Sequence, residues 1–337
     1  MEKKLLQVND MHTSFYTHVG EVQAVRGITF DLDRGEAIGI VGESGCGKSV
    51  TMLSMLKLLT DTGKMKSGQA LFDGKDLAQL NDQEMSKIRG NDIGMIFQDP
   101  MTSLNPVFTV GYQLREPLMR HKKMSKEQAN KRAIELMKLV GIPGAEKRLT
   151  QYPHEFSGGM RQRVMIAMAL TCDPKLLIAD EPTTALDVTI QAQILDLMKD
   201  LKSKINTSII LITHDLGVVA DLCNRINVMY GGKIVEQGTK RDIFYRPSHM
   251  YTLGLLRSIP NPNHEIKERL KPIDGQPPDL LHPPVGCPFA ARCEATMKIC
   301  EQQMPPLFEL GDGHRAACWL NHPDAPKVDG FGVRRSF

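Results

Sequence analysis

The chain has 337 residues, of which 41% are hydrophobic and 24% are charged, ordinary values for a globular protein with a sizeable core. Its 42 basic and 39 acidic side chains leave a net charge of only +3, which argues against a strongly basic nucleic-acid-binding protein. No apolar run approaches the length of a membrane span, and the first residues lack the apolar core of a signal peptide. We therefore expect a cytosolic protein that does not cross a membrane by itself.

The segment from residue 5 to residue 40 is expected to form short strands with turns, at Gly20-Glu21 and from Asp33 to Glu36. It contains two adjacent aromatic residues, Phe15 and Tyr16. A ring at this place could stack on a nucleotide base, or it could be a half-buried strand residue. The sequence does not choose between the two rings.

The stretch that follows carries the strongest chemical pattern. Ala37 to Val41 is an apolar run typical of a buried strand, and Ser49 to Leu59 has the apolar spacing of a helix. Between them, Gly42 to Ser49 fits the phosphate-binding pattern G-x-x-x-x-G-K-[ST] in the strand-loop-helix context that the pattern requires. Glycines let backbone N–H groups surround phosphate oxygens, Lys48 can reach the β- and γ-phosphates, and the Ser49 hydroxyl can ligate Mg²⁺. This pattern predicts a nucleotide site.

The middle of the chain predicts a strand and turn over residues 68–74, a strand over 92–97 that ends at Gln98, and a mostly helical insertion from 99 to 170. Within the insertion, Lys126 to Val140 has a helical apolar face that closes at Gly141. A second helix opens at Phe156 to Met160 and runs to about Leu170. Its two glycines after a capping Ser157 fit either a plain capped helix or a ligand close to exposed N–H groups.

Another buried strand, Lys175 to Asp180, ends in two carboxylates, Asp180 and Glu181. The first could hold the Mg²⁺ shell and the second could position an attacking water, or both could be solvated acids at a strand end. The next strand, Ser208 to Thr213, ends at His214, which we place on the ligand edge of an open α/β sheet. After it we expect a hairpin at Gly231-Gly232, and a linker in the proline-rich stretch 260–284.

Seven cysteines are present, and four of them lie in the last fifth of the chain, at Cys287, Cys293, Cys300 and Cys318. A disulfide framework is not expected in a cytosolic protein. The four could be buried thiols or metal ligands. Zinc sites contain closer pairs than these, whereas four widely spaced cysteines fit an iron–sulfur cluster better.

Taken in order, these motifs resemble those of the ATP-binding subunits of ABC transporters, most closely those of dipeptide and oligopeptide importers. Gly42 to Ser49 matches the Walker A loop, Leu176 to Asp180 the Walker B strand, and Phe156 to Met160 the signature usually written LSGGQ. Four single residues match further family positions: Gln98 the Q-loop, Glu181 the catalytic glutamate, Asp187 the D-loop and His214 the switch histidine. The stretch from Gln98 to Pro106 and the C-terminal region are similar to the peptide-importer subfamily.

Three positions depart from the family pattern. Phe156 and Met160 replace the usual Leu and Gln of the signature, and Val50 stands where a threonine is common. The contacts that those side chains would make are therefore not expected here, although no catalytic group is lost.

The resemblance implies an α/β fold with a RecA-like core sheet, an antiparallel β subdomain and a helical signature subdomain. It further implies a nucleotide-binding domain over residues 1–255 and a small irregular C-terminal extension over 256–337. Hydrolysis would use Lys48, Gln98, Glu181 and His214, and Mg²⁺ would be held through Ser49, Gln98 and Asp180. ATP would be contacted by Phe15, Tyr16, Gly42, Glu43, Ser44, Gly45, Cys46, Gly47, Lys48, Ser49, Val50 and Gln98. Ser157, Gly158 and Gly159 would act in trans on the ATP of a second subunit.

By the same resemblance, Cys287, Cys293, Cys300 and Cys318 would hold a [4Fe–4S] cluster. The implied partners are two transmembrane permease subunits, a second homologous ATPase subunit and an extracellular or periplasmic peptide-binding protein, without nucleic acid. The chain would lie peripherally on the cytoplasmic side of the cell membrane. Three alternatives stay open: an importer of nickel or another solute, an exporter ATPase for lipids or drugs, and a soluble ABC ATPase acting on DNA or ribosomes.

Overall fold

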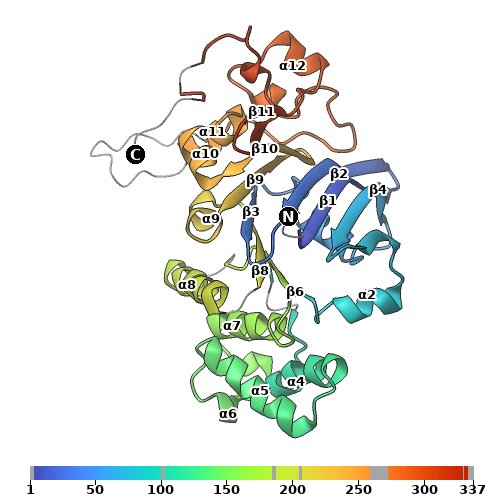
Figure 1. The fold of residues 1–337 in the computed structure, drawn as a ribbon, viewed down its shortest axis with the longest axis vertical. Helices are drawn as coiled ribbons and strands as arrows, with labels where there is room; N and C mark the ends of the chain where they lie inside the picture. Colours follow the sequence, from blue (N-terminus) through green and yellow to red (C-terminus); the bar gives the residue numbers. More distant parts are fainter. Residues whose placement is uncertain are drawn as a thin grey trace, which may run out of the picture. The chain divides into compact units, whose positions relative to one another are not determined.

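The computed structural model describes residues 4–99, 103–183, 187–204, 207–258, 272–328 and 330–332, which form two compact units. The smaller unit is built mainly from Asp33–Ala37 and Gln79–Ile212, and the larger from Lys4–Leu32, Ile38–Ala78 and the chain after Thr213 (Figure 1). Parts of three predicted segments lie outside the described residues: the stretch after Gln98, the turn before Asp187 and the proline-rich linker.

The larger unit begins with an antiparallel sheet in the order β2-β1-β4-β5. Its strands are β1 (Leu6–Thr17), β2 (Gly20–Leu32), β4 (Gly63–Phe72) and β5 (Lys75–Asp76). The expectation of short strands was wrong, because β1 and β2 run for 12 and 13 residues. The pairing of β1 with β2 shifts register between Val8 and Met11, and Asp10 between them has a left-handed φ of 44°. Such a bulge lets β1 continue past this point instead of ending there. Thr17 pairs with Gly20, so the turn precedes the predicted Gly20-Glu21.

The rest of the larger unit contains strands in the order β3-β9-β10-β12-β11. They are β3 (Ala37–Val41), β9 (Arg225–Tyr230), β10 (Lys233–Thr239), β12 (His314–Ala316) and β11 (Phe308–Gly311). The predicted hairpin is confirmed: Tyr230 pairs with Lys233, and Gly231 and Gly232 take φ values of 53° and 77°. Both values are left-handed, which is why glycines occupy this two-residue turn.

Among its described residues, the larger unit also contains the helices α1 (Lys48–Met55), α9 (Leu216–Leu222), α10 (Lys240–Tyr245), α11 (Met250–Arg257) and α12 (Lys298–Gln302). The predicted end of the first helix at Leu59 was wrong, since α1 ends at Met55. Lys57 adopts a left-handed φ of 51°, and the Leu58 N–H donates back to the Leu53 carbonyl. This is a Schellman-type ending made without the usual glycine.

The smaller unit contains a parallel sheet in the order β6-β7-β8, formed by β6 (Ile93–Ile96), β7 (Leu176–Asp180) and β8 (Ser208–Thr213). Every residue of β7 and β8 is buried. Continuous apolar strands of this kind belong to sheets that are covered on both faces. The helices α2 (Asp82–Ile88) and α8 (Val188–Lys204) belong to the same unit.

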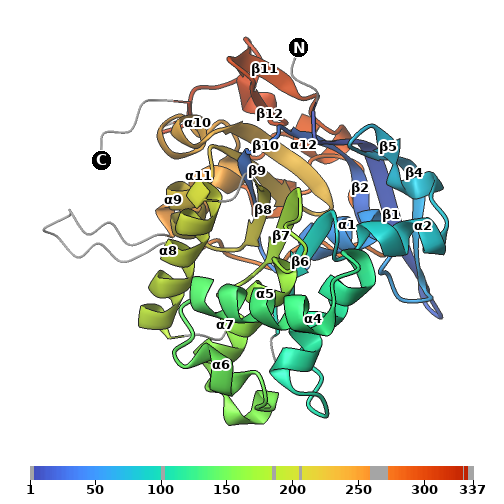
Figure 2. The ribbon, with the colours of Figure 1, turned by 60° about the horizontal axis from the view of Figure 1, so that its bottom comes forward.

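The described residues of the predicted helical insertion form the helices α4 (Val110–His121), α5 (Lys126–Leu139), α6 (Ala145–Arg148) and α7 (Gly158–Ala169). Figure 2 shows α4, α5 and α7 side by side. Ser125 caps α5 with a capping box, and Gly141, with a φ of 74°, follows its end as predicted. Short 3₁₀ turns occur at η1 (Leu77–Gln79), η2 (Pro153–Glu155), η3 (Ala290–Arg292) and η4 (Trp319–Asn321). Within the described ranges, no helix has both the length and the apolar character needed to cross a bilayer.

Candidate functional site

The loop from Gly42 to Ser49 joins the end of β3 to the start of α1. A Cβ atom on Gly42 would lie 2.1 Å from the Met229 carbonyl oxygen, and one on Gly47 would lie 2.4 Å from the Ala24 carbonyl oxygen. Gly45, with a φ of 78°, has no atom within 4 Å of its Cβ direction. The first and last glycines are thus required by close backbone packing, while the middle of the loop faces open space.

Lys48 is only 5% exposed, and its Nζ donates to the carbonyl oxygens of Gly42 at 2.7 Å and Glu43 at 2.9 Å. A buried ammonium group needs such partners, because desolvation without them is costly. The carbonyl oxygens of Gly42 and Glu43 therefore hold the Lys48 ammonium group at the start of α1. Around it, Cys46 and Gly47 are buried, Ser49 and Val50 are half-buried, and Ser44 and Gly45 are exposed. Burial raises the pKa of the Cys46 thiol, so it stays neutral.

The two aromatic residues near the end of β1 differ in their surroundings. Phe15 is half-buried, and its ring lies over Gly63, whose Cβ would come within 2.8 Å of it. Tyr16 is 43% exposed. Tyr16 is therefore the ring that is more available to a ligand.

The carboxylates predicted at the end of β7 lie in the smaller unit. Asp180 is 5% exposed, whereas Glu181 is half-buried and has a left-handed φ of 46°. The Glu181 N–H donates to the Ile212 carbonyl at 2.9 Å, and its Oε2 accepts from Gln98 Nε2 at 3.0 Å. The structure thus brings Gln98 and Glu181 together. A non-glycine residue held at positive φ is a strained position of the kind that gathers at functional sites.

The signature residues open α7 in the same unit. Ser157 is exposed and its Oγ accepts from the Met160 N–H, which makes it the helix cap. A Cβ on Gly158 would meet nothing within 4 Å. Phe156 is 2% exposed, with the Arg148 guanidinium 5.6 Å from its ring centre. The unusual phenylalanine therefore anchors the loop from inside and leaves Ser157 and Gly158 accessible. Gly159 is half-buried, and a Cβ on it would lie 3.0 Å from the Ile190 side chain.

The remaining two motif residues are exposed. Asp187 caps α8, because its Oδ1 accepts from the Ile190 N–H at 2.9 Å. His214 directly follows β8, and the next residue, Asp215, caps α9. His214 lies past a strand end, where the sequence placed it. The short turn predicted before Asp187 lies outside the described residues.

Two contacts of the phosphate-binding loop had no signal in the sequence motifs. The Glu43 N–H donates to Tyr251 Oη at 2.8 Å, and the Glu43 carboxylate pairs with both terminal nitrogens of Arg292, at 2.6 and 3.1 Å. Tyr251 belongs to α11, and Arg292 precedes Cys293. Both contacts lie within the larger unit, and the one with Arg292 connects its phosphate-binding loop to the segment predicted as the C-terminal extension.

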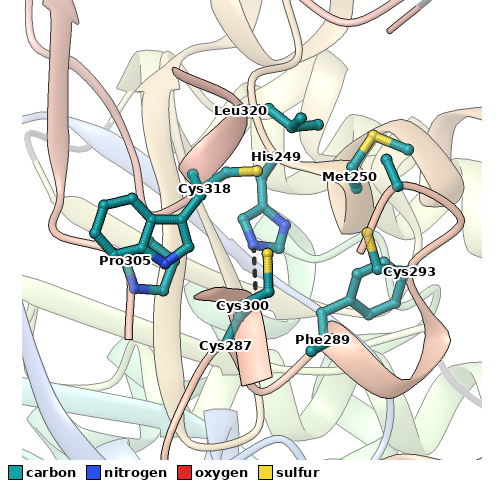
Figure 3. Close-up of a pocket in the computed structure, with 12 residues that line it drawn as sticks. His249, Met250, Cys287, Phe289, Cys293, Cys300, Pro305, Cys318 and Leu320 are labelled. Carbon is teal, nitrogen blue, oxygen red and sulfur yellow. Dashed lines mark hydrogen bonds between the residues drawn. The ribbon is translucent and has the colours of Figure 1, made fainter. Parts of the chain in front are cut away.

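The four C-terminal cysteines line one pocket, which we call the cysteine pocket (Figure 3). Its other walls are apolar or aromatic except for His249, whose Nε2 lies 4.0 Å from Cys287 Sγ. Burial, with a smaller contribution from neighbouring thiols, raises the pKa of Cys287 and of Cys318 to about 12, and burial also raises that of Cys293. Over the described part of the chain, no three His, Cys, Asp or Glu side chains form a group suited to a metal ion.

Family models match two parts of the chain. The model described as "ABC transporter" matches residues 25–184, and the one described as "Oligopeptide/dipeptide transporter, C-terminal region" matches residues 235–300. The second match covers α11 and three of the four cysteines of the cysteine pocket.

Curated relatives match over nearly the whole length. The oligopeptide transport ATP-binding protein OppD of Bacillus subtilis is 61% identical over 327 residues, 97% of this chain and 91% of the relative. The dipeptide transport ATP-binding protein DppD of the same organism is 59% identical, covering 94% of this chain and 95% of the relative.

Solved structures match the cassette part of the chain. A dimeric ATP-binding cassette in a post-hydrolysis state with ADP and Pi matches with a TM-score of 0.63 and 29% identity, over 70% of this chain and 99% of that one. A subunit of a Clostridium perfringens ABC transporter complex matches with a TM-score of 0.61 and 29% identity, over 72% of this chain and 91% of that one. The predicted fold class is confirmed by these matches.

Proposed function

The chain belongs to the ATP-binding subunits of oligopeptide and dipeptide ABC transporters, and we propose that its larger unit binds ATP and contributes His214, while its smaller unit contributes Gln98, Asp180 and Glu181 to hydrolysis. It is an ATPase that powers the import of these peptides. The observation that carries the site assignment is the Gly42–Ser49 loop, in which the Lys48 ammonium is already held by inward-facing carbonyls. The division into residues 1–255 and 256–337 stays a prediction.

Each motif residue has a role that its surroundings support. Lys48 would exchange its two carbonyl partners for β- and γ-phosphate oxygens, and Ser49 and Val50, half-buried in the first turn of α1, would offer N–H groups. Tyr16, the more exposed ring, would stack on adenine.

In the smaller unit, Glu181 would position or deprotonate the attacking water, and the Gln98 amide donates to its carboxylate. Asp180, Ser49 and Gln98 offer the oxygen ligands that suit Mg²⁺. A bound Mg²⁺ would neutralise charge on the transferred phosphoryl group. His214 would contact the γ-phosphate.

Two such subunits would form the complete site. The N–H groups at the start of α7 and the Ser157 hydroxyl would reach the ATP of a second ATPase subunit, because Ser157 and Gly158 are exposed and open. The dimeric state of the similar cassette that holds ADP and Pi supports this arrangement. The second subunit is proposed to be a homologue rather than a copy.

Exposed apolar side chains of the smaller unit support membrane partners. They include Phe97, Val107, Phe108 and Tyr112, which are 40%, 70%, 42% and 47% exposed. The rings of Phe108 and Tyr112 stack with centres 4.6 Å apart. Neighbouring exposed apolar side chains such as these two mark interaction sites. We propose that cytoplasmic loops of two permease subunits dock there, which would place the chain peripherally on the cytoplasmic side of the membrane.

The cysteine pocket is proposed to hold a [4Fe–4S] cluster through Cys287, Cys293, Cys300 and Cys318. The donor set fits, since four thiols line one pocket without any carboxylate. The raised thiol pKa values favour neutral thiols until a metal deprotonates them.

The test of transport function uses the chain purified with its genomic neighbours in lipid. Peptide together with its binding protein should stimulate ATP hydrolysis several-fold. Stimulation by nickel or another solute with its own binding protein, and none by peptide, would assign a different substrate.

A further inference from the structure

The phosphate-binding loop carries an acidic residue, Glu43, directly after its first glycine. The Glu43 side chain is 26% exposed, and both of its oxygens accept from Arg292, whose side chain is 6% exposed. Paired charges with this two-bond geometry are among the stronger polar contacts in proteins. An acid so close to bound phosphates would repel them unless its charge were balanced, and Arg292 balances it.

The Arg292 guanidinium is held on all sides. Its Nε donates to the Asp274 carbonyl at 2.9 Å, one terminal nitrogen donates to the Ile273 carbonyl at 3.0 Å, and the other donates to Tyr230 Oη at 3.1 Å. The rings of Tyr230 and Phe289 lie 5.8 and 5.9 Å from it. Burial lowers the pKa of Arg292, but its hydrogen bonds to Glu43 and Tyr230 outweigh this and raise it, so it stays charged.

This arrangement is continuous with the cysteine pocket. Arg292 directly precedes Cys293, and Phe289, which lines the pocket, contacts both Tyr230 and Tyr251 with ring centres 5.2 and 5.3 Å apart. Tyr251 in turn accepts the Glu43 N–H. Both the backbone and the side chain of Glu43 therefore depend on residues that wall the pocket or adjoin it.

We propose that Arg292 is a positioning residue for ATP binding: it neutralises Glu43, fixes the Walker A loop, and makes nucleotide affinity depend on the order of the cysteine pocket. The inference rests on ATP binding at Lys48. It does not require any particular metal in the pocket, because the contacts that carry it are made by the protein alone.

The test measures the binding of a fluorescent ATP analogue to the full chain and to three variants. Arg292→Gln should raise the Kd about 5- to 10-fold, because Glu43 is left as an uncompensated negative charge beside the phosphates. Glu43→Gln should raise the Kd less than Arg292→Gln does, since it removes the charge that needs balancing. The double variant should return to within about twofold of Glu43→Gln.

Rescue by Glu43→Gln is the decisive outcome, because a merely structural defect in Arg292→Gln would persist in the double variant. An unchanged Kd in folded Arg292→Gln, or equal losses in the single and double variants, would overturn the proposal. Arg292→Lys keeps the charge but not the two-bond geometry, and its expected two- to threefold loss should be rescued in the same way. It replaces Arg292→Gln if that variant does not fold.

Two controls separate this inference from the site assignment. Arg257→Gln breaks the pair of Arg257 with Glu294 at 3.1 Å in the same region and should leave the Kd unchanged. Lys48→Ala should abolish most binding. If Lys48→Ala binds ATP normally, the Walker A assignment is wrong. If it does not, and Arg292→Gln binds normally, only the role of Arg292 is wrong.

Discussion

In the larger unit, the cation expected to meet phosphate, Lys48, is buried and held by two carbonyl oxygens of its own loop. In the smaller unit, the acid expected to meet the attacking water, Glu181, is half-buried, has a strained φ of 46°, and is held by one amide from Gln98. The Lys48 ammonium is thus fixed by backbone groups, whereas the Glu181 carboxylate is held by a side chain and lies on a strained backbone. The contrast indicates that binding and hydrolysis can be altered separately.

The largest expected effect is a loss of ATP hydrolysis with ATP binding retained. Glu181→Gln should lower ATP turnover roughly 100- to 1,000-fold, because the amide cannot accept a proton from water. The affinity for ATP should stay within about twofold. Phosphate release by the assembled complex and nucleotide titration measure the two quantities. Glu135→Gln, an exposed acid on α5, is the matched control. A Glu181→Gln complex with normal turnover would mean that another base acts.

The converse change belongs to the larger unit. Lys48→Ala should weaken ATP binding by about 10- to 100-fold, the loss expected for a charge-assisted contact to phosphate. Lys75→Ala removes an exposed lysine of β5 and should bind ATP like the parent chain. If Lys48→Ala instead lowered only turnover, the division of roles between the two units would fail.

Ser157→Arg sharpens the comparison, because its effect should appear only when two ATPase subunits meet. The exposed arginine would obstruct the face of the second subunit, so hydrolysis should fall at least about tenfold while ATP binding to the isolated chain is kept. Ser125→Arg loses an equivalent helix cap on α5 and controls for the resulting destabilisation of about 1 kcal/mol. Equal loss of binding and hydrolysis would place the signature in the same subunit as Lys48.

The smallest expected effect is on the Kd for ATP, and it comes from a change in the cysteine pocket. The parent chain, purified without air, should be brown and absorb broadly at about 400 nm. Cys293→Ser should remove the colour and raise the Kd for ATP about two- to fivefold through the neighbouring Arg292. Cys172→Ser, in the smaller unit, should change neither. A colourless parent chain with stoichiometric zinc would contradict the cluster.

The Walker A loop could be predicted because its geometry depends on residues that are contiguous in sequence, from Gly42 to Ser49. The ends of β7 and β8 followed from apolar runs that stop at Asp180 and at Thr213. These are short-range patterns, in which a residue type and its neighbours decide the local backbone.

The features that sequence reasoning missed depend on tertiary contacts. The helix α1 ends at Met55 because Lys57 adopts a left-handed backbone conformation, which a lysine does not predict. The greater exposure of Tyr16 relative to Phe15 depends on the packing of Phe15 against Gly63. The contact between Glu43 and Arg292 joins residues 249 positions apart, a separation at which a single sequence carries no local signal.

That separation also has a consequence in time for a chain made from its N-terminus. At a synthesis rate of about 5 to 20 residues per second, roughly 12 to 50 seconds pass between the emergence of Glu43 and that of Arg292. Throughout this interval the nascent chain carries the Walker A sequence with an uncompensated acid. Truncated products that stop before residue 292 share this defect, so only nearly complete subunits acquire full affinity for the cell's ATP.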